Sequence, residues 1–204
     1  MPYDTLPPKE TLAKTIEALK ANNINVHLVD TKEQALDMIK TLVPTGAELM
    51  TGGSTTLEQI GFIDLLKTGL HPWKSFKDKI FAEKDQAKQM ELRKQSVLAD
   101  YFLASVHGIT EAGETVTASF SGSQIPSFVF TSPHVIWVAG AQKIVPTLED
   151  ALKRVREYCL PREDQRMKSL GTAGSSISMM LIYNRQPLPS RTIDLILVNE
   201  VVGV

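Results

Sequence analysis

The sequence predicts an α/β fold: a Rossmann-like, mostly parallel sheet with helices on both faces. Short and nearly all-apolar runs, such as "DYFLASVH" and "HVIWVAG", alternate with segments in which apolar residues recur at helical spacing. Strands that are apolar on both faces are typical of a parallel sheet that helices cover on both sides. The 204 residues suffice for one sizeable core, so we expect a single domain over residues 1–204.

The first elements alternate between helix and strand. Apolar residues from Leu12 to Leu19 recur at helical spacing and predict an N-terminal helix at about residues 8–22. "INVHLV" then alternates as a strand does. Thr31 and Gln34 have the spacing of a capping box, which predicts the start of a second helix.

A short apolar strand, "AELM", precedes a third helix. Thr55 and Glu58 offer a second capping box for that helix, and Gly69 is placed to end it. Residues 71–97 are charged and irregular at first and become helix-like from about Lys84.

The second half continues the alternation. "TEAGETVTA" predicts a turn and a short extended piece, and "SQIPSFVFTS" favours a helix that admits Pro126 in its first turn. Thr147 begins a clear helix that includes Cys159 and that Pro161 is expected to stop. Residues 162–178 carry no clear pattern. "MMLIYN" and "TIDLILV", joined by "RQPLPSR", predict a strand pair near the C-terminus.

Composition excludes several function classes. The 22 basic and 23 acidic residues give a net charge of −1, which disfavours a nucleic-acid partner. Cys159 is the only cysteine, so an intramolecular disulfide and a metal site built from several thiolates are excluded. We predict no metal and no cofactor.

No apolar run approaches the roughly 18 residues of a membrane span, and no signal peptide is evident, so we expect a cytoplasmic protein without membrane association.

The stretch "LMTGGSTTLEQIG" is the first candidate site, because ligands of an open parallel sheet bind beyond the carboxyl ends of its strands. Gly52 and Gly53 let the backbone turn sharply and approach a ligand. The amides of Ser54, Thr55 and Thr56 would then face an anion at a helix N-terminus. A tight turn followed by a capped helix explains the same residues, so both interpretations stay open.

Two later loops carry further candidates. His107, Thr110 and Glu111 follow the strand "YFLASV", and a histidine near a carboxylate suits acid/base catalysis. Alternatively, His107 is a hydrogen-bonded core residue and Glu111 faces water. In "AGAQKIV", Gly140 allows close approach and Lys143 supplies a counter-charge for an anion, unless it is simply a solvated surface lysine.

Four stretches together resemble the LUD domain, a family associated with lactate utilisation: "TGGSTTLEQIGF", "LADYFLASVHGITEAGETV", "VIWVAGAQKIVPTLEDALKRVREYCLP" and "IDLILVNEVVG". The resemblance covers about residues 9–204. It implies a fold similar to phosphosugar isomerases and CoA transferases, in which a glycine-rich loop contacts the phosphate or carboxylate of the substrate. By position that loop corresponds to Gly52–Thr55, and the later sites correspond to His107–Glu111 and Gly140–Lys143.

Two departures from the family pattern stand out. Family members commonly carry Asn at the position of His107, and many have a cysteine cluster near the C-terminus that "RMKSLGTAGSSISMM" lacks. The resemblance implies that the chain binds a small anionic metabolite: an organic acid, a phosphosugar or a CoA-like molecule. The alternative is a non-catalytic partner of iron–sulfur oxidoreductase subunits in a lactate-oxidising complex. The family also suggests a homo-oligomer.

Overall fold

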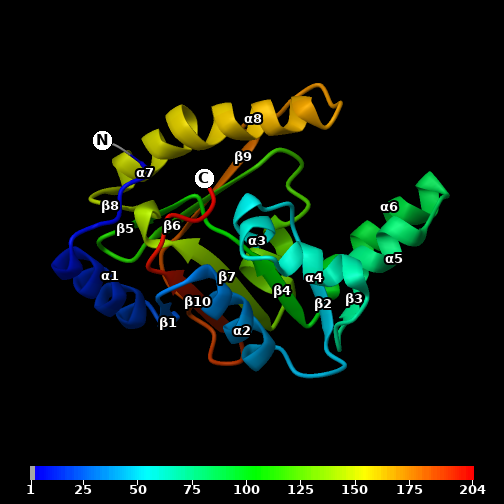
Figure 1. The fold of residues 1–204 in the computed structure, drawn as a ribbon, viewed down its shortest axis with the longest axis horizontal. Coiled ribbons are helices and arrows are strands. Elements are labelled where there is room, and N and C mark those ends of the chain that lie inside the picture. Colours follow the sequence, from blue (N-terminus) through cyan, green and yellow to red (C-terminus); the bar gives the residue numbers. More distant parts are fainter. Residues whose placement is uncertain (1–2) are drawn as a thin grey trace.

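Two sheets organise the computed structural model, which describes residues 3–204 (Figure 1). The larger sheet has six parallel strands in the order β1-β10-β7-β4-β2-β3. The smaller sheet is mixed and has the order β8-β5-β6-β9. The strands are β1 (Asn25–Val29), β2 (Glu48–Thr51), β3 (Lys74–Ser75), β4 (Tyr101–Ala104), β5 (Gly108–Thr110), β6 (Thr115–Ser119), β7 (His134–Gly140), β8 (Ile144–Val145), β9 (Met179–Tyr183) and β10 (Thr192–Val198).

Helices pack around the larger sheet, while α7 and α8 form a long rod beyond its end and α5 and α6 extend to one side (Figure 1). In residues 3–204 no helix is both long and apolar enough to cross a membrane. The helices are α1 (Lys9–Ala21), α2 (Lys32–Leu42), α3 (Thr55–Gln59), α4 (Phe62–Thr68), α5 (Phe76–Ala82), α6 (Gln86–Gln95), α7 (Leu148–Arg154) and α8 (Leu160–Ser169), with short turns η1 (Ser96–Leu98), η2 (Ser127–Thr131), η3 (Ala141–Lys143) and η4 (Val155–Cys159).

Both faces of the larger sheet are buried, which explains why its strands are apolar at successive positions. Leu195 and Leu197 of β10 pack with Trp137 in the cluster on one face. Ile196, between those two leucines, packs with Val138 in the cluster on the other face. Side chains alternate along a strand, so the central strands β10, β7 and β4 contribute to both clusters. The predicted α/β fold with its parallel sheet is confirmed.

Helix caps follow the sequence only in part. The capping box of α2 is confirmed, because the Thr31 side chain accepts a hydrogen bond from the Gln34 amide at 3.3 Å. The capping box predicted at Thr55 is wrong. Ser54 caps α3 instead, by accepting a hydrogen bond from the Leu57 amide at 3.3 Å. Ser54, one position earlier, supplies the hydroxyl oxygen that caps the helix, so Thr55 is the first helical residue.

The chain near the C-terminus differs from the expected simple strand pair. Strands β9 and β10 are both present, but β9 lies antiparallel to β6, whereas β10 lies between β1 and β7. Pro161 does not stop a helix, which corrects the prediction. The chain passes through the π-helical turn η4 into α8, and Pro161 lies in the first turn of α8. Pro161 closely follows the π-helical turn, which changes the backbone hydrogen-bond pattern at the point where the missing amide would donate, so the helix continues.

Candidate functional site

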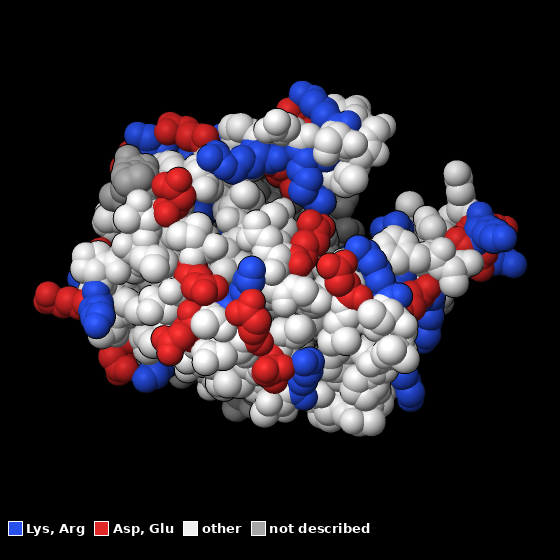
Figure 2. Space-filling model, viewed as in Figure 1, with Lys and Arg blue, Asp and Glu red and all other residues white. Residues whose placement is uncertain are grey.

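A cavity of about 440 Å³ lies at the carboxyl ends of β2 and β4, beneath α8. Its wall includes residues 52–56 after β2, residues 105–107 after β4, residues 118–121, 123 and 124 around the end of β6, and part of α8 with residues 175–177 beyond it. Figure 2 shows the corresponding hollow beneath α8, with basic side chains at its rim. The volume suits a small metabolite.

The glycine-rich loop lines this cavity and also caps a helix. A Cβ atom at Gly52 would lie 2.6 Å from Gln124 Oε1, so the backbone approaches that side chain closely. A Cβ atom at Gly53 would meet only Arg166 Nη2, at 3.8 Å. Ser54 and Thr55 belong to the cavity wall although the Ser54 side chain caps α3. Helix α3 has five residues, so its dipole contributes little to the binding of an anion.

Lys143 brings a buried amine to the wall of the cavity. It follows β7 on η3, and only 2% of its surface is exposed. Its Nζ atom donates to Thr56 Oγ1 at 3.0 Å, to Ser105 Oγ at 3.0 Å and to the Val106 carbonyl at 3.2 Å. Among residues 3–204, no carboxylate lies within 4.0 Å of Nζ. Lys143 is therefore not the solvated surface lysine of the alternative interpretation.

Burial is the main cause that lowers the pKa of Lys143 from 10.5 to about 7, and the nearby Arg154 guanidinium lowers it further. Arg154 is completely buried; its Nη1 atom donates to the His107 carbonyl and, at 3.0 Å, to Cys159 Sγ. Two buried basic groups thus lie close to one end of the cavity. A charge removed from water is costly unless a partner compensates it, so this end of the cavity favours an anion.

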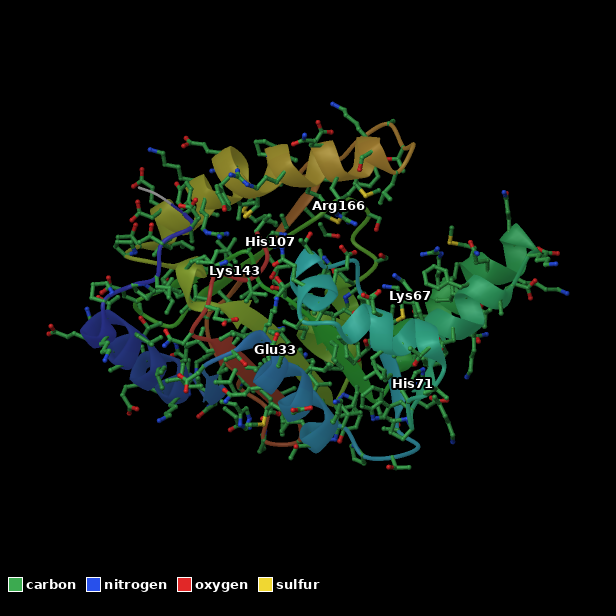
Figure 3. All side chains as sticks on the ribbon, in the orientation of Figure 1. Glu33, Lys67, His71, His107, Lys143 and Arg166 are labelled. Atoms are coloured by element: carbon green, nitrogen blue, oxygen red, sulfur yellow. The ribbon has the colours of Figure 1, made fainter. Side chains whose placement is uncertain are left out.

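His107 lies beside Lys143 below α7 and α8 (Figure 3). Its Nδ1 atom accepts a hydrogen bond from the Ala118 amide at 3.2 Å, which places the proton of the neutral ring on Nε2. Burial, Lys143 and Arg154 lower the pKa of His107 to about 3. A ring with this pKa is neutral at pH 7 and suits donation of a hydrogen bond better than proton abstraction.

Three predicted site residues lie away from the cavity wall. Thr110 Oγ1 donates to Glu114 Oε2 at 3.1 Å, and Glu111 pairs with Lys14 of α1 at 3.0 Å. At Gly140 a Cβ atom would lie 2.7 Å from the Glu200 carbonyl oxygen, so this glycine allows the C-terminal segment to pack on β7. The structure therefore brings together the glycine-rich loop, His107 and Lys143, but not these three residues.

Two cations of the cavity wall were not predicted from the sequence. Arg93 of α6 and Arg166 of α8 both line the cavity. Arg166 binds Glu163 through Nε and Nη2, each at 2.8 Å, and its Nη1 atom lies 3.5 Å from Glu58 of α3 (Figure 3 labels Arg166). The Glu163 and Arg166 spacing of three was a helical signal within the unassigned segment 162–178.

The wall is rich in hydroxyl groups and carries more basic than acidic side chains. The lining residues include the basic side chains of Arg93, Lys143 and Arg166 and, within residues 3–204, one acidic side chain, that of Glu163. Within residues 3–204 no group of three or more His, Cys, Asp or Glu side chains is arranged to hold a metal ion. Nine serines share the wall: Ser54, Ser96, Ser105, Ser119, Ser121, Ser123, Ser127, Ser175 and Ser176.

Fold and site together define an α/β protein with a polar, basic cavity at the carboxyl edge of a parallel sheet. The model of the LUD domain matches residues 12–203, so the chain belongs to the LUD domain family. No curated protein is significantly similar to it in sequence.

A solved structure shares this fold. The crystal structure of a DUF162 family protein from Deinococcus radiodurans is 13% identical, with a TM-score of 0.55 over 96% of this chain and 100% of the other. Weaker similarity links the chain to ribose 5 phosphate isomerase A from Neisseria gonorrhoeae, at 14% identity and a TM-score of 0.34 over 77% and 76% of the two chains. eIF2B beta from Chaetomium thermophilum is 11% identical, with a TM-score of 0.38 over 58% and 44%.

Proposed function

We propose that this LUD-domain protein binds a small organic anion in the cavity below α8, in keeping with a role in organic-acid or lactate utilisation. The observation that carries the proposal is Lys143: a buried amine in the wall of a cavity, with hydroxyl and carbonyl partners but no carboxylate. An anion in the cavity would supply the negative charge that this buried basic end of the cavity lacks.

The other wall residues fit the same ligand class. Arg93 and Arg166 add positive charge on α6 and α8, and the serine hydroxyls can donate to carboxylate or phosphate oxygens. Organic acids and phosphosugars therefore match the chemistry of the wall directly. A CoA-like molecule would place its acyl end in the cavity and its larger part outside.

A thermal-shift screen tests the proposal. We expect lactate, pyruvate, a phosphosugar or an acyl-CoA to raise the Tm of the wild-type protein, because a ligand at about 100 times its Kd adds roughly 2.7 kcal/mol of stability. Lys143→Met should lose the shift. Lys153→Met, which changes an exposed lysine on α7, should keep it. A shift of equal size in all three proteins would place the ligand elsewhere.

A partner subunit without a reaction of its own is the second candidate function. The side chains of Leu98 on η1 and Phe130 on η2 are 67% and 72% exposed, and Ser127 Oγ donates to the Val97 carbonyl at 3.3 Å, which joins these two turns. Exposed apolar groups on adjacent turns suit a protein interface. Copurification of an iron–sulfur subunit with the wild-type chain, and its loss in the Leu98→Ser, Phe130→Ser double variant, would support this function.

A further inference from the structure

The amine of Lys143 belongs to a cluster with two hydroxyl groups. Nζ lies 3.0 Å from both Thr56 Oγ1 and Ser105 Oγ, and the two oxygens are 3.1 Å apart. The residues come from three separate segments, after β2, β4 and β7, and all three line the cavity. The fold therefore builds a compact group of one amine and two proton carriers at the wall of the cavity.

The surroundings of Nζ favour a neutral amine. Its partners are two hydroxyl groups, one of which can donate to the lone pair of a neutral amine, and a carbonyl oxygen, and the nearby charged side chain is the Arg154 guanidinium rather than a carboxylate. A neutral lysine in a buried site is a nucleophile toward carbonyl carbon, whereas an ammonium group is not. Lysines that serve only as counter-charges are held in the charged form by a nearby acid.

We propose that Lys143 attacks the carbonyl carbon of the anion that binds in the cavity and forms an imine with it. The inference rests on the proposed function and narrows its ligand to an anion that carries a ketone or an aldehyde. Small 2-oxo acids and open-chain sugar phosphates share this chemistry. Arg93 and Arg166 would bind the carboxylate or phosphate, and Lys143 would bind the carbonyl end.

The reaction balances without an oxidant or a reductant. The Nζ lone pair forms a C–N bond to the carbonyl carbon, and the C=O π pair moves to oxygen. The Thr56 and Ser105 hydroxyls pass one Nζ proton to that oxygen and give a neutral carbinolamine. Its C–O bond then breaks, the hydroxyl group leaves with the second Nζ proton as water, and the C=N bond forms. Addition of water reverses every step.

Two pairs of probes separate binding from imine formation. Pyruvate has a ketone, whereas lactate has a hydroxyl group at the same carbon; D-ribose 5-phosphate has an aldehyde in its open form, whereas ribitol 5-phosphate has none. Each probe is incubated with the wild-type protein. Thermal shift reports binding, and borohydride reduction followed by peptide mass spectrometry locates any trapped secondary amine. The two pairs distinguish a 2-oxo acid from a sugar phosphate.

We expect the carbonyl member of one pair to label Lys143 at least tenfold more than the exposed Lys153, and its reduced partner to bind without labelling. Lys143→Arg should lose the label and Lys153→Met should retain it. In the Thr56→Val, Ser105→Ala double variant, Lys143 should be labelled at least tenfold more slowly than in the wild type. This second variant keeps the test valid if the Lys143 variant folds poorly.

Different outcomes would overturn different proposals. A thermal shift with all members of a pair, but with no trapped amine on Lys143, would refute the imine and leave anion binding intact. Equal labelling of Lys143 and the exposed lysines would also refute it. If none of the four probes gave a thermal shift or a label, both proposals would be overturned for these ligand classes.

Discussion

The backbone of Gly203 packs directly against the amine cluster of Lys143. A Cβ atom at Gly203 would lie 3.0 Å from Lys143 Nζ and only 1.9 Å from Thr56 Oγ1, and the φ angle of +74° is one that a side chain rarely adopts. The Gly203 amide also donates to Gln59 Oε1 at 2.6 Å. The C-terminal segment therefore forms part of the site by enclosing the amine.

Gly203→Ala should disturb this arrangement. The added methyl group would displace the C-terminal segment from Thr56, and the left-handed backbone adds roughly 1 kcal/mol of strain. We expect a loss of about 1–3 kcal/mol in the free energy of unfolding, measured with urea, together with weaker binding of the anion. Gly171→Ala is the matched control, since Gly171 also has a positive φ but no atoms near its added Cβ. Equal ligand affinity in both variants would contradict a role of Gly203 at the site.

The stability of the protein should depend on the protonation of Lys143. Its pKa is about 7 in the fold against 10.5 ordinarily, so between these values the unfolded chain binds more protons than the folded one. The free energy of unfolding should therefore rise with pH across this window, by up to about 1.4 kcal/mol per pH unit from this group.

Lys143→Met isolates that contribution. The free energy of unfolding of the wild type minus that of the variant should increase from pH 7 to pH 10 in urea titrations, because the variant has no amine at position 143 to titrate. His107, Arg154 and Cys159 are the other ionisable groups that face the amine, and they are present in both proteins. A stability difference that stays constant with pH would show that the amine titrates normally in the fold.

The main sheet was predictable because the same feature, an apolar run buried on two faces, marks each long strand. The runs that became β7 and β10 are apolar at successive positions, and both lie in the centre of the sheet. The partners of β9 were not predictable in this way. Strand β9 pairs with β6, 60 to 68 residues earlier, and nothing in the local pattern specifies so distant a partner.

The candidate site was predictable at its loops but not at its charges. Gly52, Gly53 and Lys143 follow strands and therefore meet at one edge of the sheet. Arg166 lies on α8, which contains Pro161 in its first turn, and the proline was interpreted as a stop because a π-helical turn leaves no signature in the sequence. Glu111 follows a strand as well, but that strand belongs to the smaller sheet and directs the residue toward Lys14.

Arg191 should be essential for stability although it lies outside the cavity wall. The residue is 5% exposed, and its guanidinium group donates to the carbonyls of Ser132 at 3.0 Å and Ser127 at 2.9 Å, and to the Tyr183 hydroxyl at 3.1 Å. Arg191→Met would leave these buried oxygens without donors, at about 1–3 kcal/mol each. We expect a loss of roughly 3 kcal/mol or more in urea unfolding. The exposed Arg185→Met should change stability by less than about 0.5 kcal/mol.

Gly53→Val tests whether the glycine-rich loop serves as a cradle for the anion or only as a capped turn. Gly53 does not have a positive φ, and an added Cβ atom meets only Arg166 Nη2, so the substitution strains the backbone little. Its branched side chain would extend along the cavity wall toward Arg166. We expect ligand affinity to fall at least tenfold while the urea midpoint changes little, and Gly53→Ala should have an intermediate effect on affinity.

Ser54→Ala gives the opposite pattern if the loop is only a cap, because it removes the oxygen that accepts from the Leu57 amide and should cost about 1 kcal/mol of stability. A Gly53→Val protein that binds the anion with unchanged affinity would leave capping as the function of this loop.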